Sequence, residues 1–529
     1  MKKLASFFVA AMMIISATSC ENLFFGKEKN MGDMVYFTFE VETPQTRSQT
    51  DTEGNDTYVS STDGTEAGTD AENNINDVQL IFADQNGNYI TDAEISSTVG
   101  TRGQYVVAFK SEDLKKKAGK TVKVYLQCNT PKVTVDGGPN APSNINFLDA
   151  TFDATDTETY AKANAFYMTN AQAVSFNIPS DLKPYTSETT PLDLGIIVVE
   201  RAAARFDIGP ASGSSKTYDA SKGAYKVEGV DGLYIKLTDI AMVNISENQY
   251  YYRRVSEDGS NNNEVISGVE MPNNYVVDVD WAAKRSANGD FVAGTTYEEF
   301  RTSMSNSKWW TSLSSLNQDD SYDGSYKIWR YTSENTLPAV AGTPATPVTA
   351  TMNNSTGVVF RGKLVVTEAL TDTDLKNGLS SPQTYGTIYA YDDVILGNWA
   401  RVKALAETAG NEDEAFSIAY KAAMALGGVD KAKECGFVPY TPNSNGYEMV
   451  YLYWNRHNDN LENTVNGVME FATVRNNVYK LAVDEITKLG YPFGGDTPPG
   501  DTKVEQEEVF FKVRVKVLPW VVRKNAIEF

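Results

Sequence analysis

Met34-Val35-Tyr36-Phe37-Thr38-Phe39-Glu40-Val41-Glu42 is the stretch that sets the expectation for the whole fold. Its apolar side chains recur at every second position, which predicts a β-strand with one face buried in a core. Thr43-Pro44 follows, and the proline predicts the end of the strand because it cannot donate a hydrogen bond to a sheet. Arg47 comes soon after, in a segment that we expect to be an accessible loop.

Similar segments follow along the chain, separated by Gly, Asn, Asp and Pro. This punctuation favours antiparallel sheets joined by turns over alternating βαβ units, and the spacing suggests β-sandwiches. Helical periodicity is confined to a few places, mainly 297–316 and 399–426, and the turn-rich stretch 209–215 lies near an expected domain junction. The predicted strand segments are 78–84, 104–109, 120–128, 194–208, 233–245, 358–370, 447–454, 476–487 and 510–522.

The composition excludes several classes of function. The chain has 529 residues, 41% of them hydrophobic, and a formal net charge of −22. The excess of carboxylates disfavours binding to nucleic acid, whose phosphates need clustered Lys and Arg. With only one histidine and three cysteines, the chain is poor in the soft ligands that His/Cys zinc sites use. We therefore expect no nucleic-acid partner, no metal and no cofactor.

No sequence motif indicates an enzyme, because phosphate-binding, dinucleotide-binding, HExxH, GxSxG and CxxC patterns are all absent. The acidic stretch 317–324 resembles a calcium loop, but Arg330 stands where such a loop needs glutamate. His457 lies in a polar stretch and is expected in a surface turn. Cys128 and Cys435 are expected to be free thiols, with a disulfide between them as the open alternative.

The N-terminus has the features of an export signal. Lys2 and Lys3 precede the apolar run 4–17, which is too short to span a bilayer. The run ends in Ala17-Thr18-Ser19-Cys20, which resembles a bacterial lipobox in which Cys20 is lipidated and becomes the new N-terminus. The alternative is an ordinary secreted protein that is cut nearby.

A second strand near the C-terminus repeats the apolar pattern of the first. Phe511, Val513, Val515 and Val517 form a stripe of four, preceded by a Gly/Pro/Asp linker at 494–501 that could let the strand leave its own domain. Cleavage at Arg47 would release the first strand, and the second strand of a neighbouring molecule could enter the vacated groove. The alternative is that these are simply the first and last strands of the fold and that neither moves.

Several segments resemble the fimbrilins of Bacteroidales, which form type V pili, and in particular the shaft subunit of the minor (short) fimbria. The resemblance is strongest at Val515-Lys516-Val517-Leu518-Pro519-Trp520, and it extends to 474–479, 488–490, 199–205 and 120–125. Two features depart from the family pattern: Ala17 replaces the usual large aliphatic residue of the lipobox, and the linker before the last strand is short.

The resemblance implies a mainly β fold with two transthyretin-like antiparallel β-sandwich domains, with a few helices inserted in the second. It also implies a precursor that is exported as an outer-membrane lipoprotein and cut by an extracellular arginine-specific protease between Arg47 and Ser48. The implied segments are a signal peptide (1–19), a lipidated propeptide with the removable strand (20–47), two domains (48–195 and 196–505) and a donor strand (506–529).

By the same resemblance, the protein is a non-enzymatic shaft subunit of a cell-surface fimbria that polymerises by donor-strand exchange and supports adhesion. Its partners would be further copies of itself, anchor and tip subunits, the protease, and the outer membrane through the lipid on Cys20. The removed strand would supply Val35, Phe37, Phe39 and Val41, and the donor strand would supply Phe511, Val513, Val515, Val517, Leu518 and Trp520.

Two other interpretations stay open at this point. The first is a non-polymerising tip or anchor subunit, although the apolar stripe at the C-terminus argues against a tip subunit. The second is a surface lipoprotein that binds glycans on exposed aromatic side chains. The only candidates for such a platform are Trp309-Trp310 and Tyr250-Tyr251-Tyr252, for which packing in a core or interface is the competing explanation.

Overall fold

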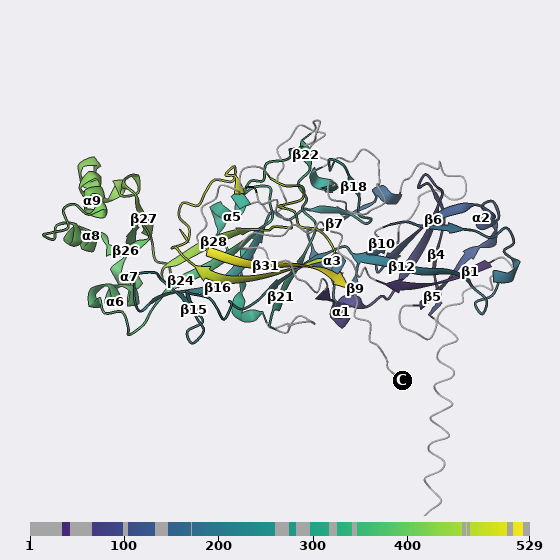
Figure 1. Ribbon diagram of the computed structural model, residues 1–529, viewed down its shortest axis with the longest axis horizontal. Helices are drawn as coiled ribbons and strands as arrows, with labels where there is room; N and C mark the ends of the chain where they lie inside the picture. Colours follow the sequence, from purple (N-terminus) through teal and green to yellow (C-terminus); the bar gives the residue numbers. More distant parts are fainter. Residues whose placement is uncertain are drawn as a thin grey trace, which may run out of the picture.

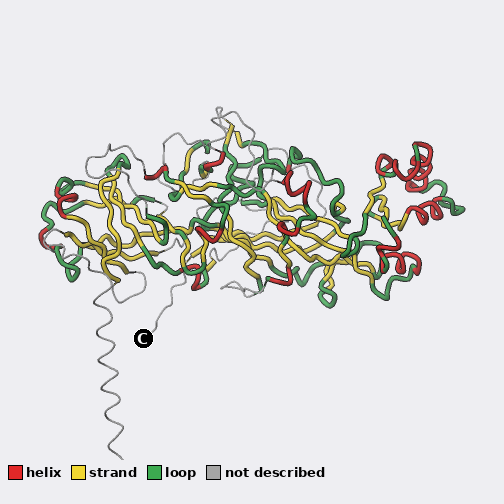
Figure 2. The backbone as a smooth tube through the Cα atoms, turned by 180° about the vertical axis from the view of Figure 1, so that it is seen from behind, coloured by secondary structure: helices red, strands yellow, loops and turns green. Residues whose placement is uncertain are grey.

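The computed structural model shows an elongated molecule in which strands fill two neighbouring units and the longer helices gather at one end (Figures 1 and 2). None of the helices in the ranges below is long and apolar enough to cross a membrane. The residues that the structure describes are 34–42, 66–98, 104–132, 147–170, 172–259, 275–281, 297–316, 325–340, 346–457, 462, 466–504 and 511–521.

The first unit is one sheet that closes on itself. Its short strand β10 pairs with β12 on one side and with β6 on the other, so the strands form a ring around a single core. In spatial order the strands are β10 (Met168–Asn170), β12 (Leu192–Arg201), β1 (Met34–Glu42), β5 (Gln104–Lys110), β4 (Tyr89–Thr98), β3 (Val78–Ala83), β6 (Thr121–Cys128) and β11 (Val174–Asn177). The mainly β fold expected from the alternating pattern is thus observed.

The second unit packs two sheets against each other around a second core. Phe206 of one sheet and Phe360 of the other are both buried in this core. The first sheet has the order β2 (Glu66–Ala67), β31 (Phe511–Val521), β29 (Asn477–Ile486), β13 (Ala204–Ile208) and β21 (Lys327–Thr332). The second has the order β14 (Tyr218–Asp219), β15 (Ala224–Lys226), β16 (Leu233–Val243), β24 (Gly357–Val366), β28 (Glu448–Trp454) and β30 (Tyr491–Pro492), and β20 (Thr311–Ser312) pairs with β16.

An insertion between β24 and β28 carries the longest helices and projects from the end of the second unit (Figure 1). The predicted helical stretch 399–426 is two helices, and their apolar faces pack on a small sheet through Val402, Ala419 and Tyr420. The elements are α6 (Thr373–Ser380), α7 (Pro382–Tyr385), β25 (Ile388–Tyr391), β26 (Val394–Asn398), α8 (Trp399–Ala406), α9 (Ala415–Leu426) and β27 (Phe437–Tyr440).

Short elements complete the two units. Strand β17 follows β16 in the chain but pairs with β7 of the first unit. The segment that contains β17, which we call the arm, therefore crosses the junction between the units. The helices are α1 (Asp70–Asn73), α2 (Ser111–Lys115), α3 (Thr157–Tyr160) and α5 (Tyr297–Ser303), and the strands are β7 (Thr151–Asp153), β8 (Ala161–Lys162), β9 (Ala165–Phe166), β17 (Asn248–Tyr250), β18 (Val255–Ser256), β19 (Tyr275–Val276), β22 (Ala339–Val340) and β23 (Thr346–Pro347).

Four predictions from the sequence need correction. The stretch 194–208 is two strands in two different sheets, because the chain passes between the units at Ala202-Ala203, so the proposed boundary at 195/196 falls inside β12. The stretch 209–215, which we expect near the domain junction, comes after this crossing in the chain. Of 297–316, only Tyr297–Ser303 is α-helix. His457 is fully buried, with its Nδ1 2.9 Å from the Tyr479 hydroxyl, because later segments cover a turn that is polar in sequence.

Cys128 is buried and Cys435 half-buried, and both are free thiols. Burial raises the pKa of Cys128 far above its usual range, so this thiol is inert at neutral pH. The acidic stretch 317–324 lies outside the described ranges. Within those ranges, no group of three His, Cys, Asp or Glu side chains is placed to hold a metal ion.

Buried charged side chains join the two units. Glu72 of α1 lies 3.1 Å from Arg205 of β13, which also contacts Asp207 at 2.7 Å, and all three are nearly inaccessible to solvent. Tyr331 donates to Glu72 at 2.8 Å, and Arg201 donates to the Glu72 carbonyl at 3.1 Å. Burial opposes ionisation of Glu72, but Arg205 and Arg201 outweigh it and hold the pKa of Glu72 below its usual range.

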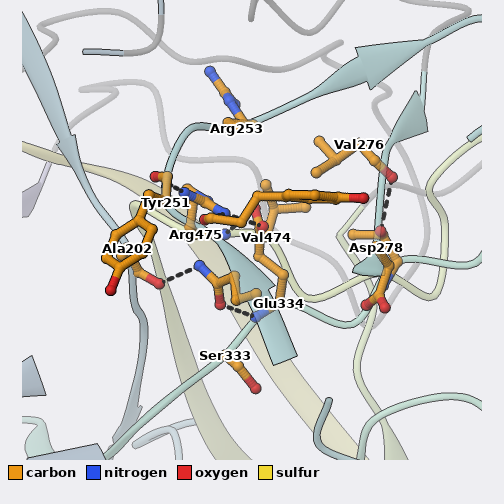
Figure 3. Close-up of polar contacts among 12 residues, drawn as sticks. Ala202, Tyr251, Arg253, Val276, Asp278, Ser333, Glu334, Val474 and Arg475 are labelled. Carbon is orange, nitrogen blue, oxygen red and sulfur yellow. Dashed lines mark hydrogen bonds and ion pairs between the residues drawn. The ribbon is translucent and has the colours of Figure 1, made fainter. Parts of the chain in front are cut away.

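A second cluster of buried polar side chains contacts the arm (Figure 3). Arg475 binds Glu334 at 2.7 Å and donates to the carbonyls of Tyr250 and Tyr251 at 2.7 and 2.9 Å. Gln249 reaches from the arm to the Ala202 carbonyl at 2.6 Å. The cluster therefore fixes the arm to the point where the chain crosses between the units.

We predict that Glu72→Gln destabilises the protein by about 3–5 kcal/mol, because it leaves Arg205 buried without its full countercharge. Chemical denaturation at pH 7 measures this loss. Glu158→Gln, at an exposed carboxylate on α3, is the matched control and should change the free energy of unfolding by less than about 0.5 kcal/mol. Equal effects of the two variants would contradict a structural role for the buried pair.

We predict that Asp278 makes the protein less stable as the pH rises from about 4 to 7. Burial, with a smaller contribution from Asp280, raises the pKa of Asp278 to about 7, against about 3.9 in an unfolded chain. The native state therefore holds a proton in this window that the unfolded state has lost, and the free energy of unfolding falls as the pH rises. Asp278→Asn should remove this slope. Relative to the parent, the free energy of unfolding of the variant should therefore rise by about 1–4 kcal/mol between pH 4 and pH 8. Parallel stability curves for the two proteins would contradict the assignment.

Candidate functional site

Strand β1 occupies the interior of the first sheet. It pairs antiparallel with β5 from Met34↔Lys110 to Glu40↔Gln104, and it pairs parallel with β12 from Phe37↔Leu192 to Glu42↔Val198. It is thus hydrogen-bonded on both sides, although it is the first described strand of the chain. Removing it would open a groove between β5 and β12.

The inward face of β1 fills an aromatic core. Val35, Phe37 and Phe39 are at most 1% exposed, and Val41 is half-buried against the same core. The Phe37 ring makes edge contacts with three other rings, and Phe39 stacks on Tyr105 at 5.8 Å. The rings around Phe37 are Phe82 at 5.2 Å, Phe109 at 5.3 Å and Phe176 at 6.2 Å between centroids. The apolar stripe predicted from the sequence is therefore a row of core side chains.

The outward face of β1 is graded from buried to exposed. Tyr36 is 6% exposed, and burial, with a smaller effect of Glu188, raises its pKa. Thr38 is half-buried and donates to the Tyr105 carbonyl at 3.1 Å, whereas Glu40 is exposed. A strand that replaced β1 would therefore need an apolar residue at the Tyr36 position, whereas the half-buried Met34 and Thr38 positions and the exposed Glu40 position could accept charged side chains.

The predicted donor strand is β31, and it lies in the second unit. It pairs antiparallel with β29 from Asn477↔Pro519 to Ile486↔Phe511, and within the described part of the chain its other edge is paired only at Trp520 and Val521, with β2. Phe511, Val513 and Val515 are buried in the second core, where the Phe511 ring contacts Tyr451 at 5.3 Å and Phe360 at 5.9 Å. Val517, Leu518 and Trp520 belong to the strand by backbone pairing.

The linker before β31 is docked onto the second unit, contrary to its expected freedom. Its carbonyls at Pro498, Gly500 and Thr502 accept hydrogen bonds at 3.0, 2.9 and 3.0 Å, and the donors are Tyr297 Oη and the backbone amides of Asn353 and Met352. Val504 donates to the Ala350 carbonyl at 3.2 Å. Any movement of β31 within the native fold must therefore hinge after Val504.

The structure places the predicted site residues in two separate sheets. Val35, Phe37, Phe39 and Val41 line the first core, and Phe511, Val513 and Val515 line the second. Cys20, Arg47 and Ser48 lie outside the described residues. Sequence reasoning missed the buried charges at the junction, although Arg201 and Arg205 stand in an otherwise apolar segment, which was the available signal.

The aromatic residues considered as a glycan platform are packed instead. Tyr250 and Tyr252 are buried. Trp309 and Trp310 are half-buried, and their ring nitrogens donate to Ser303 Oγ at 3.2 Å and to the Met304 carbonyl at 2.7 Å. Core and interface packing therefore accounts for these side chains.

Comparisons with known proteins give one match to a family model and several to solved structures. Residues 444–526 match the family model described as "Major fimbrial subunit protein type IV, Fimbrillin, C-terminal". No curated protein matches the chain significantly. Among solved structures, a fimbrilin from Porphyromonas gingivalis is 13% identical with a TM-score of 0.41, covering 93% of this chain and 99% of that one.

Two further structures span similar shares of the chain. A tip fimbrial protein from Porphyromonas gingivalis is 10% identical with a TM-score of 0.35, covering 92% of this chain and all of that one. A protein named for cell adhesion from Parabacteroides distasonis is 11% identical with a TM-score of 0.43, covering 94% and 99%. The sequence match lies over β28, β29 and β31, and this part of the chain is therefore similar to the C-terminal region of fimbrial subunits.

Proposed function

We propose that this protein is the shaft subunit of a cell-surface fimbria and polymerises by protease-triggered strand exchange. The family match over residues 444–526 carries the proposal, because it names a fimbrial subunit and includes all of β31. It also agrees with the expectation of a structural protein without enzymatic activity. In this proposal, export as a lipoprotein through Cys20 precedes cleavage at Arg47-Ser48, and β1 then leaves the first unit.

The positions of the two strands suit this exchange. The loss of β1 would leave β5 and β12 with unpaired edges, and β31 of a neighbouring copy could satisfy both. Four apolar side chains at about 1.5–3 kcal/mol each, with hydrogen bonds at about 0.5–1.5 kcal/mol each, would hold such a joint. One copy gives a strand and the next receives it, so the contact is heterologous and extends into a filament.

The departing strand β31 has one long neighbour, which limits the cost of its release. Among the described residues, β29 alone pairs with residues 511–519. Because Val504 is docked, the seven residue steps from Val504 to Phe511 set the reach of the released strand, which is at most about 25 Å. Anchor and tip subunits, which end a filament, would be its other partners.

We predict that limited trypsin cleaves the chain 21–529 once, after Arg47, and that oligomers resistant to SDS without boiling then appear. Release of β1 is the required step, so Arg47→Ala should abolish both the cut and the ladder. Intact mass and unboiled SDS gels provide the measurement. A clean cut after Arg47 that yields only monomer would point instead to a tip or anchor subunit.

We predict that a disulfide between β29 and β31 blocks polymerisation reversibly. Glu485 and Lys512 are opposite each other across this pair and both are half-buried, so Glu485→Cys with Lys512→Cys can tie the strand down. The oxidised, cleaved variant should stay monomeric, and reduction should restore the ladder. Lys512→Cys alone is the control. Polymers forming equally well from the oxidised variant would rule out β31 as the donor.

A further inference from the structure

We infer that the incoming strand enters the groove in a specific register, with residues 508–516 of the donor replacing β1. This inference rests on the proposed exchange and names the segment of the second copy that fills the site. Matching the two apolar stripes in sequence order sets Phe511 at the Val35 position and Val517 at the Val41 position. The geometry of the groove favours a register shifted by two residues, in which Phe511 takes the place of Phe37.

The size of each position in the groove is the first argument. The Phe37 position is surrounded by the rings of Phe82, Phe109 and Phe176, so a small side chain there would leave a cavity. In the sequence-order register this position receives Val513, and Phe511 is forced into the place of the smaller Val35. In the shifted register the Phe37 position receives Phe511, and the Val35 position receives Val509.

The outward face gives an independent argument. Tyr36 is buried, whereas Glu40 is exposed, so the site accepts an apolar residue at the first position and a charged residue at the second. The shifted register supplies Phe510 and Arg514 at these positions, and the sequence-order register supplies Lys512 and Lys516. Burying the Lys512 ammonium at the Tyr36 position would be costly unless Glu188, whose charge acts on this position, paired with it.

The direction of the donor follows from the same comparison. If the strand ran the opposite way with Val515 at the Val35 position, Arg514 would stand at the buried Tyr36 position and Phe510 at the exposed Glu40 position. The donor therefore runs as β1 does, antiparallel to β5 and parallel to β12. Read in this sense, Glu-Val-Phe-Phe-Lys-Val-Arg-Val-Lys at 508–516 replaces Met-Val-Tyr-Phe-Thr-Phe-Glu-Val-Glu at 34–42.

One position of this register fits poorly. Val513 takes the place of Phe39, whose ring stacks on Tyr105, so the joint contains a gap at this point. A larger side chain at residue 513 should therefore tighten the joint. Residue 511 fits in both of its environments, because its ring contacts Tyr451 and Phe360 before the exchange and would meet Phe37's neighbours after it.

Cysteine pairs at one acceptor position distinguish the registers. Gln104 lies opposite Glu40, so in the shifted register it faces Arg514 of the incoming strand and in the sequence-order register it faces Lys516. The chain 21–529 with Cys435→Ser, Gln104→Cys and Arg514→Cys should give a ladder on boiled, non-reducing gels after cleavage and oxidation. The same chain with Lys516→Cys in place of Arg514→Cys shares the acceptor cysteine and should not.

Each outcome of this experiment has a defined meaning. A covalent ladder from the Lys516 variant alone, or from neither variant although unboiled polymers form, would overturn the register while strand exchange stands. An absence of any polymer from the Cys435→Ser parent, under conditions that cut Arg47, would overturn the proposed function together with the register.

Peptides test the fit without altering the fold. The synthetic peptide 505–519, added at cleavage, should compete with the donor strand and shorten the ladder. Phe511→Ala in the peptide should raise the concentration for half-inhibition at least about 100-fold, and Val513→Phe should lower it. Weaker competition by the Val513→Phe peptide, or a negligible effect of Phe511→Ala, would contradict the shifted register.

Discussion

The contact of the Phe37 ring with Phe82, Phe109 and Phe176 is the interaction on which the first unit depends. It places the earliest described strand in the middle of a closed sheet, with partners on both edges. Within this sheet β1 is paired on both edges, so its removal would leave the edges of β5 and β12 without their partner. A strand in this position completes the core of the first unit, and under the proposed cleavage its loss would leave a groove that only a strand of similar shape could fill.

The junction between the units relies on charges that water does not reach. Arg201 and Arg205 leave the first sheet and enter the second within a few residues, and Glu72 meets them from α1. Such pairs contribute little net stability compared with apolar packing, but they tolerate few alternative arrangements because a misplaced buried charge is so unfavourable. The crossing at Ala202-Ala203 is short, and the arm that contains β17 contacts it through the hydrogen bond from Gln249 to the Ala202 carbonyl. The two units are accordingly held in one relative position.

Local sequence patterns predicted well where the strands lie, but they predicted poorly which sheets the strands join and which side chains pack against them. The period-two stripes lie in β1 and β31, and their described apolar side chains face a core, because alternation reports directly on which face of a strand is buried. The stretch 194–208 looked continuous, since no Gly or Pro marks the crossing at Ala202-Ala203. His457 was misplaced because the segment that covers it is distant in sequence. The volumes around Phe37 and Tyr36, which decide how a donor would fit, depend on residues from several strands and emerge only from the assembled sheet.

The orientation of the strands has a mechanical consequence. Figure 1 shows β31 in the second unit and β12 in the first running roughly along the long axis of the molecule. A strand that replaced β1 would lie in the same direction, because β1 and β12 are parallel neighbours. Tension along a fibre built end to end from such units would load the hydrogen bonds of each joint in shear, all at once, rather than peel them apart one at a time. A surface filament under fluid drag would then resist breakage far better than its thermodynamic stability alone suggests.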